Sequence, residues 1–237
     1  MGTVTDNPPS AATSVLRSIL SGIYRHNQQQ GLGKIVQITA AKSGDGTSYV
    51  ARNLALLASS DLAQSGQRVA LIDYDTSQRA QSQYFFAPQR INGMSGPYDA
   101  SYGQSGFWAA QDRQGQSREI SDLCAFYLDG HTGLAVSTFL TDRMFDGETI
   151  VLRQVPEYWQ NLRRHFAFVI IDSPAMDRWH EALTLAPLVD TTVLVAEAER
   201  ANDPTHEMAK QAILNAGGRY EGLLLNAGAP VQLVDTA

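Results

Sequence analysis

The fold predicted for this chain depends on residues 35–56, which read IVQITAAKSGDGTSYVARNLAL. Residues 35–39 form a short apolar run with β-branched side chains, which is typical of a strand. Residues 42–48 are small and polar and predict a turn, and residues 49–60 carry apolar side chains at helical spacing. A strand, a glycine-containing turn and a helix in this order direct backbone N–H groups and a helix N-terminus at one point, which is a geometry that binds phosphate.

The turn matches the phosphate-loop pattern G-x-x-x-x-G-K-[ST] only in part. Gly46 and Ser48 supply its second glycine and its hydroxyl, but Thr47 stands at the lysine position and Ala41 at the first glycine. The sequence therefore predicts the frame of a nucleotide site without its main cation. The candidate nucleotide-binding residues of the loop are Lys42, Ser43, Gly44, Asp45, Gly46, Thr47 and Ser48.

Composition excludes several classes of protein. The 237 residues are 43% hydrophobic, enough for one sizeable core, and the formal net charge of −6 argues against a broad basic face that binds nucleic acid. Cys124 is the only cysteine, so no intrachain disulfide can form. With no signal peptide visible, we expect a cytoplasmic protein. No run approaches the roughly 18 apolar residues of a membrane span, so any membrane association is expected to go through a partner or a surface helix.

Strands and helices alternate along most of the chain. Further strands are predicted at residues 69–72, 133–139, 167–172, 191–196 and 221–226, and further helices at residues 13–26, 146–166, 181–189 and 204–215. This alternation implies crossover connections and a parallel sheet. We therefore predict a single α/β domain with a doubly wound, mostly parallel sheet and helices on both of its faces.

The predicted domain spans residues 13–228, after a disordered N-terminus at residues 1–12 and before a tail at residues 229–237. Residues 76–130 are rich in Gly, Ser, Gln, Tyr and Phe with little periodicity, and they predict an irregular insertion. An unstructured segment of this length is unusual in a compact domain, so we expect it to be functional or mobile. Its aromatic side chains either fold it onto the domain or form a docking surface for a partner or membrane.

Polar side chains follow several of the predicted strands. Asp73 and Asp75 close the second strand, Asp172 closes another and Asn226 ends the last. One aspartate after an apolar strand usually belongs to a turn or caps a helix. Several strands that each end in a polar side chain favour a ligand-binding site instead, because ligands of open α/β sheets lie beyond the carboxyl ends of the strands. Phosphate-bound magnesium takes a loop hydroxyl and neighbouring carboxylates. We therefore predict that Ser48, Asp73 and Asp172 hold Mg²⁺ if a nucleotide binds.

These motifs together resemble the ParA/MinD-type P-loop superfamily and, within it, the CpsD/CapB-type bacterial tyrosine kinase domains of exopolysaccharide systems. The resemblance is carried by the loop KSGDGTS followed by Asn53-Leu54-Ala55, by Leu71-Ile72-Asp73-Tyr74-Asp75, by Gly133-Leu134-Ala135-Val136, by Val169-Ile170-Ile171-Asp172-Ser173-Pro174-Ala175 and by Asn226. It implies a P-loop NTPase-like fold, ATP or ADP with Mg²⁺ as ligand, and Asn226 near the adenine. In an active member, Asp75 would position the attacking water.

The departures from the family pattern are equally specific. Thr47 replaces the lysine that binds the β- and γ-phosphates, and Ser77 replaces an arginine that follows the second aspartate motif. The family's oligomerisation helix, E-x-x-R-x-x-R, aligns with Ser14, Arg17 and Leu20, so one charge of the three is kept. The family's C-terminal tyrosine cluster has no counterpart, because Tyr220 is the last tyrosine.

A charge-assisted hydrogen bond contributes about 1.5–3 kcal/mol, so loss of the lysine predicts nucleotide affinity that is about ten- to a hundred-fold weaker. Catalysis suffers more, because that lysine also stabilises charge developing on the transferred group. Lys42 lies where ParA/MinD-type proteins keep a second lysine that reaches a nucleotide across a dimer. It is either that residue or an ordinary loop lysine.

Three functions follow as alternatives. In the first, the chain is a degenerate regulatory or scaffolding component of exopolysaccharide biosynthesis and export, with weakly bound ATP or ADP or no cofactor. Its partner would be a membrane polysaccharide co-polymerase or a homologous kinase or ATPase subunit. In the second, it is an ATPase switch that forms a homodimer on ATP through Lys42. In the third, it is an active cytoplasmic tyrosine kinase.

Overall fold

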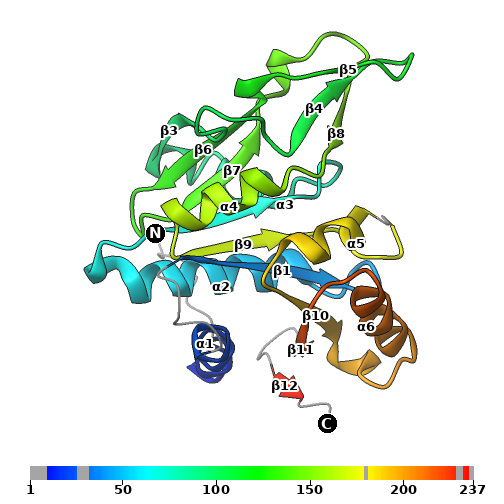
Figure 1. Cartoon of the computed structure of the whole chain (residues 1–237). Coiled ribbons are helices and arrows are strands. Elements are labelled where there is room, and N and C mark those ends of the chain that lie inside the picture. Colours follow the sequence, from blue (N-terminus) through cyan, green and yellow to red (C-terminus); the bar gives the residue numbers. More distant parts are fainter. Residues whose placement is uncertain (1–9, 26–31, 179–180, 228–231, 235–237) are drawn as a thin grey trace.

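The structure is a computed structural model that describes residues 10–25, 32–178, 181–227 and 232–234. Its centre is a nine-stranded sheet with the order β12-β11-β10-β1-β9-β2-β7-β6-β3 (Figure 1). The inner strands from β11 to β7 run parallel to their neighbours, and β12, β6 and β3 are antiparallel additions at the two edges. The predicted mostly parallel α/β fold is confirmed.

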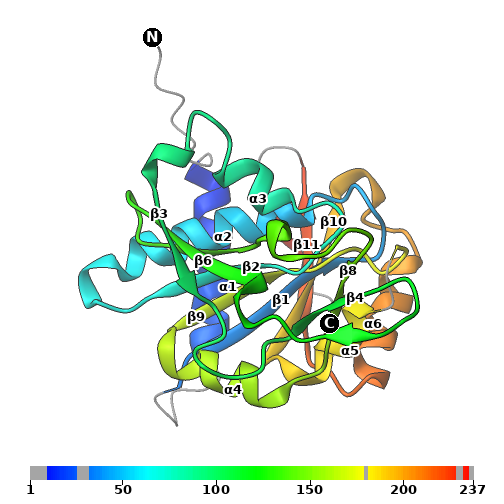
Figure 2. The same cartoon turned by 90° about the horizontal axis from the view of Figure 1, so that it is seen from above.

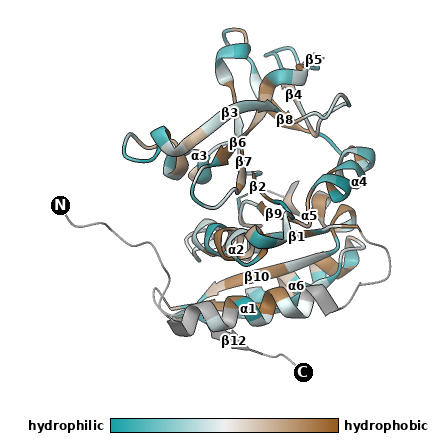
Figure 3. Cartoon of the chain, turned by 90° about the vertical axis from the view of Figure 1, so that its left-hand side faces the viewer, coloured by the Kyte–Doolittle hydropathy of each residue, from teal (hydrophilic) through white to brown (hydrophobic). Residues whose placement is uncertain are grey.

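The parallel strands are β1 (Lys34–Ala40), β2 (Val69–Asp73), β7 (Ala135–Phe139), β9 (Phe168–Asp172), β10 (Thr191–Glu197) and β11 (Tyr220–Asn226). The antiparallel strands of the same sheet are β3 (Met94–Asp99), β6 (Cys124–Asp129) and β12 (Gln232–Val234). Strands β1, β2 and β9 are buried along their whole length, as expected for strands covered on both faces. Hydrophobic colouring is strong on β10, whereas the loops around β5 are hydrophilic (Figure 3).

Helices cover both faces of the main sheet (Figure 2). They are α1 (Ser10–Arg25), α2 (Thr47–Leu62), α3 (Ala80–Phe85), α4 (Pro156–His165), α5 (Glu181–Leu185) and α6 (Thr205–Asn215). Successive side chains of a strand point to opposite faces, so Val36 and Ile38 pack with α1 and α2, whereas Ile35 packs with α4. Helix α6 packs separately on β10 and β11.

The segment predicted to be irregular, residues 76–130, is instead mostly structured. It contains α3, β3, β4 (Trp108–Gln111), β5 (Ser117–Arg118) and β6. Strands β5 and β4 join β8 (Thr149–Leu152) in a second, three-stranded antiparallel sheet. Sequence periodicity missed these strands because they are short and flanked by turns.

Aromatic side chains fold this segment onto the main sheet. Phe107 is fully buried, and its ring stacks on Trp159 of α4 and on Tyr74 after β2, with centroids 5.1 and 5.4 Å apart. Trp108 is also buried and donates its indole N–H to the Ile120 carbonyl at 2.8 Å. The aromatic residues thus serve mainly as core, although Tyr98 is 49% exposed.

The single helix predicted at residues 146–166 is wrong in its first half. Residues 149–152 form β8, because the β-branched run Thr149-Ile150-Val151 pairs with β4. The helix begins at Pro156, whose missing N–H and fixed φ suit the first turn of a helix. The side chains of Tyr158, Trp159 and Leu162 then bury one face of α4.

Both ends of the predicted domain differ from expectation. Helix α1 begins at Ser10, three residues before the predicted start, and residues 1–9 of the predicted disordered terminus lie outside the described residues. In the predicted tail, β12 pairs with β11. Within the described ranges, no helix combines the length and apolar character needed to cross a bilayer.

Replacement of Phe107 by alanine is expected to lower the free energy of unfolding by about 3–5 kcal/mol, because it opens a cavity between α4 and the second sheet. Urea denaturation followed by circular dichroism measures this change. The control is Met208→Ala, since Met208 is 69% exposed on α6 and its truncation should change stability by less than about 0.5 kcal/mol. Equal effects of the two substitutions would contradict the role of Phe107.

Candidate functional site

The loop between β1 and α2 depends on two glycines with left-handed backbone. Gly44 has φ +91° and Gly46 has φ +89°. A Cβ at Gly46 would lie 2.0 Å from Nδ2 of Asn226, so only glycine fits there. Asn226 ends β11 and donates from Nδ2 to the Asp45 carbonyl at 3.1 Å. Asn226 therefore supports the backbone of the loop.

A cavity of about 320 Å³ opens beside this loop at the carboxyl ends of β1, β2 and β9. It brings together six predicted site residues, namely Ser43, Gly44, Gly46, Thr47, Ser48 and Asp75. Its far wall includes Gln78 after β2 and, after β9, Ser173, Pro174, Ala175 and Arg178. Helix α2 begins at Thr47, and no side chain of the described residues caps its N-terminus. Its first N–H groups are therefore available to an anion.

The two buried carboxylates of the predicted magnesium site lie side by side, because β2 and β9 are paired with Asp73 opposite Asp172. Both are almost fully buried. Burial and, as a second cause, the neighbouring Asp172 carboxylate raise the pKa of Asp73 to about 8. Burial likewise raises the pKa of Asp172 to about 6, although hydrogen bonds from Gln81 and the Ser48 hydroxyl oppose the shift. The pair thus holds a proton more tightly than exposed carboxylates do.

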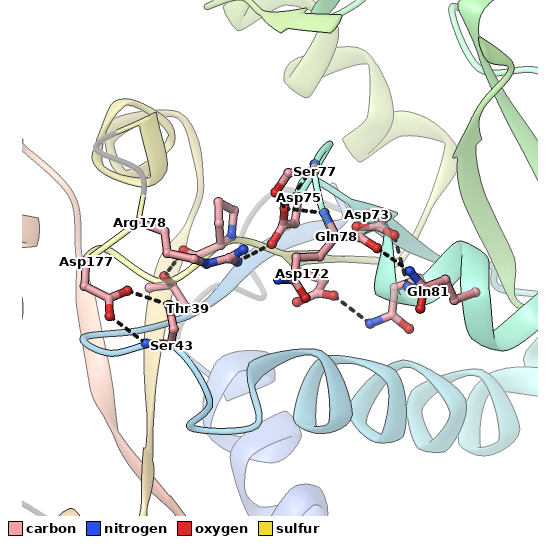
Figure 4. Close-up of polar contacts among 12 residues, drawn as sticks. Thr39, Ser43, Asp73, Asp75, Ser77, Gln78, Gln81, Asp172, Asp177 and Arg178 are labelled. Carbon is pink, nitrogen blue, oxygen red and sulfur yellow. Dashed lines mark hydrogen bonds and ion pairs between the residues drawn. The ribbon is translucent and has the colours of Figure 1, made fainter. Parts of the chain in front are cut away.

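Gln81, in the first turn of α3, binds the carboxylate pair (Figure 4). Its Nε2 donates to Asp172 Oδ2 at 2.7 Å and to the Ser48 carbonyl at 2.9 Å, and its backbone N–H donates to Asp73 Oδ2 at 3.0 Å. Arg52 donates to Gln81 Oε1 at 3.3 Å, which orients the amide group toward Asp172. Sequence reasoning missed Gln81, because only tertiary packing brings α3 beneath the loop.

The residues Ser48, Asp73 and Asp172 fit a magnesium ion by their chemistry. They are hard oxygen donors, and Asp73 Oδ1 is buried without a hydrogen-bond partner among the described residues. Three protein donors leave room for phosphate oxygens and water, as Mg²⁺ requires. No group of three or more His, Cys, Asp or Glu side chains in the described ranges could hold a metal ion by itself. A magnesium ion at this place would therefore need the Ser48 hydroxyl beside the two carboxylates.

Two charged residues of the loop are paired within the chain, away from the cavity. Lys42 Nζ lies 2.5 Å from Asp203 Oδ2, and Asp45 Oδ1 lies 2.5 Å from Nη2 of Arg200. The Asp203 pKa is lowered mainly by its hydrogen bond from Lys42. Asp45 is 1% exposed, so its ion pair with Arg200 anchors the loop to the segment after β10. Lys42 and Asp45 therefore stabilise the loop through ion pairs that lie outside the cavity.

Asp75 faces the cavity and is paired with Arg178 (Figure 4). Burial acts to raise the Asp75 pKa, but hydrogen bonds from the Gln78 N–H, the Ser77 hydroxyl and Arg178 outweigh it and lower the pKa. Ser43 also contacts this wall, since its N–H and hydroxyl donate to Asp177 at 2.9 and 2.8 Å. Arg178 was not among the predicted site residues. Its only sequence signal is its position six residues after Asp172.

Comparison with known proteins identifies relatives of this chain. The chain is 28% identical over 223 residues to the CapB tyrosine-protein kinase of Staphylococcus aureus, covering 94% of this chain and 87% of CapB. It is 24% identical over 197 residues to the tyrosine-protein kinase CpsD of Streptococcus pneumoniae, covering 81% and 75%. The chain is a homologue of the CapB/CpsD-type bacterial tyrosine kinases. No protein-family model matches it.

Solved structures show the same fold. The kinase domain of the Escherichia coli tyrosine kinase ETK superposes with a TM-score of 0.62 at 21% identity, over 98% of this chain and 81% of ETK. The cell division ATPase MinD of Pyrococcus furiosus superposes with a TM-score of 0.51 at 18% identity, over 82% and 72%. At these identities the comparison establishes the fold alone. The predicted resemblance to tyrosine kinases with a P-loop NTPase-like fold is confirmed.

The raised pKa of Asp73 predicts how stability depends on pH. The native state keeps the proton up to about pH 8, whereas the unfolded chain releases it near 3.8. Between these values the native state binds more protons, so rising pH lowers the free energy of unfolding, by about 1.4 kcal/mol per pH unit at most for one proton. In the Asp73→Asn variant, the free energy of unfolding should therefore fall less between pH 5 and pH 8. Urea denaturation at each pH measures this change.

The control for this experiment is Asp142→Asn, because the Asp142 side chain is 75% exposed. It should keep the wild-type pH dependence. If Asp73→Asn and wild type lose stability in parallel as the pH rises, Asp73 is not protonated in the native state.

Proposed function

We propose that this chain is a degenerate relative of the CapB/CpsD-type tyrosine kinases, with the fold kept and phosphate transfer lost. It binds ATP or ADP with magnesium weakly and hydrolyses ATP slowly or not at all. Its role is regulatory or scaffolding, in exopolysaccharide biosynthesis and export. Its partner is a membrane polysaccharide co-polymerase or a homologous kinase subunit with an intact loop.

The observation that carries this proposal is Thr47 at the lysine position of a loop that is otherwise well formed. Thr47 lines the cavity where a lysine would meet the β- and γ-phosphates. Lys42 does not compensate within one chain, because it is paired with Asp203 and does not line the cavity. The loop itself therefore offers a nucleotide backbone N–H groups but no lysine that faces the cavity, which supports weak binding.

The N-terminal helix supports a role that does not depend on kinase-type oligomers. Arg17, the one charge kept from the family's oligomerisation pattern, pairs with Asp61 of α2 at 2.8 Å. Leu16 and Leu20 of the same helix are buried in the core. This face of α1 is therefore used within the chain. The link to polysaccharide export rests on the homology.

Isothermal titration calorimetry with magnesium ATP tests the proposal. Wild type should bind weakly, and Thr47→Lys should bind about ten- to a hundred-fold more tightly, the range expected for one charge-assisted hydrogen bond. The matched control is Ser60→Lys, which adds the same charge at an exposed position of α2 and should leave the affinity unchanged. Tight wild-type binding with steady ATP turnover would falsify the proposed function.

The rival function, an ATPase switch that dimerises on ATP through Lys42, makes a different prediction. In the proposed function, magnesium ATP leaves the molar mass of wild type unchanged in multi-angle light scattering, because Lys42 is engaged by Asp203 in its own chain. The Lys42→Ala variant should behave in the same way. ATP-dependent dimers of wild type that disappear in Lys42→Ala would establish the switch instead.

A further inference from the structure

The cavity beside the loop has one cationic side chain, and that side chain comes from outside the loop. Among the described residues that line it, Arg178 is the only lysine or arginine. We infer that Arg178 is the phosphate-binding cation of this site and replaces the lysine missing at position 47. This inference rests on the proposed function, since it names the residue that makes weak nucleotide binding possible.

The backbone around Arg178 is fixed at the mouth of the loop. The N–H of Ser173 donates to the Ile38 carbonyl and the N–H of Met176 to the Ala40 carbonyl, each at 2.9 Å. The next residue, Asp177, accepts two hydrogen bonds from Ser43 of the loop itself. The segment after β9 is therefore fastened directly to the loop, and Arg178 follows its last anchor (Figure 4).

The chemistry of a guanidinium suits this position. Arginine stays charged at all working pH values and binds phosphate oxygens through two parallel N–H groups. The opposite wall of the cavity is the start of α2, a 16-residue helix whose dipole also favours an anion. A phosphate in the cavity would thus lie between helix N–H groups on one side and the guanidinium on the other.

Asp75 holds the guanidinium when no phosphate competes for it. The Arg178 side chain is 33% exposed, whereas the Asp75 side chain is 6% exposed, so Asp75 is the fixed partner and Arg178 the adjustable one. A phosphate must compete with this carboxylate and also meets its negative charge. Both effects weaken anion binding, so removal of the Asp75 charge should strengthen it.

A purely structural ion pair makes a different prediction. If Arg178 only neutralises Asp75, Arg178→Gln weakens binding by exposing the Asp75 charge, and it should have no effect once Asp75 is replaced by asparagine. If Arg178 binds phosphate, Arg178→Gln should weaken binding in both backgrounds. The effect of Arg178→Gln in the Asp75→Asn background therefore separates the two roles without any assay of catalysis.

The experiment is titration of the full chain with magnesium ADP, with urea denaturation to confirm that each variant is folded. We expect Arg178→Gln to raise the Kd about ten- to a hundred-fold and Asp75→Asn to lower it. Arg178→Gln should weaken binding to a similar extent in the Asp75→Asn background. Arg178→Lys should keep part of the affinity, and Thr47→Lys should restore binding to Arg178→Gln. The control is Arg164→Gln, because Arg164 is exposed on α4 outside the lining of this cavity and should not change the Kd.

The inference is overturned if Arg178→Gln binds as wild type does, or if Arg178→Gln has no effect on the Kd in the Asp75→Asn background. It is also overturned if neither wild type nor Asp75→Asn binds magnesium ADP at millimolar concentration, an outcome that leaves the proposed scaffolding role intact. Steady ATP turnover by wild type, in contrast, would remove the proposed function but not the effect of Arg178 on binding.

Discussion

The parallel pairing of β2 with β9 is the constraint on which the rest of the site depends. It sets Asp73 opposite Asp172 in a buried register, so two carboxylates of like charge share one apolar environment. Such a pair is costly unless protons, hydrogen bonds or a cation compensate it. In this chain the pKa values of both carboxyl groups are raised, which favours their uncharged forms, and the amide of Gln81 donates a hydrogen bond to Asp172. A metal ion would have to displace that amide.

The charged side chains around the loop are also compensated, in this case by ion pairs within the chain. Asp45 is paired with Arg200, Lys42 with Asp203 and Asp75 with Arg178, so each charged group near the phosphate position already has an internal partner. Two of these ion pairs fasten the loop to the segment after β10, and the third joins the segments after β2 and β9. The ion pairs also remove the free positive charge that would bind phosphate tightly. This neutralised charge is the basis of the weak nucleotide binding proposed above.

The second sheet illustrates a separate role for packing. Its strands are short and leave few backbone hydrogen bonds to stabilise them, so the stacked rings of Phe107, Tyr74 and Trp159 fasten it to α4 and β2. Tyr74 lies between Asp73 and Asp75 in the chain. The aromatic cluster and the carboxylate site therefore share one short segment.

The sequence by itself determined the six parallel strands of the main sheet, the loop and the two acidic strand ends, because local periodicity and short motifs such as Leu71-Ile72-Asp73 specify each of these. It also identified the missing lysine at Thr47. Only the tertiary structure decided that β8 is a strand, that Gln81 lies on Asp172 and that Arg178 faces the cavity. The physical reason is separation along the chain. Arg178 and Asp75 are 103 residues apart and Lys42 and Asp203 are 161 apart, so no local pattern relates them, and they meet only because parallel strands bring their carboxyl ends to one edge of the sheet.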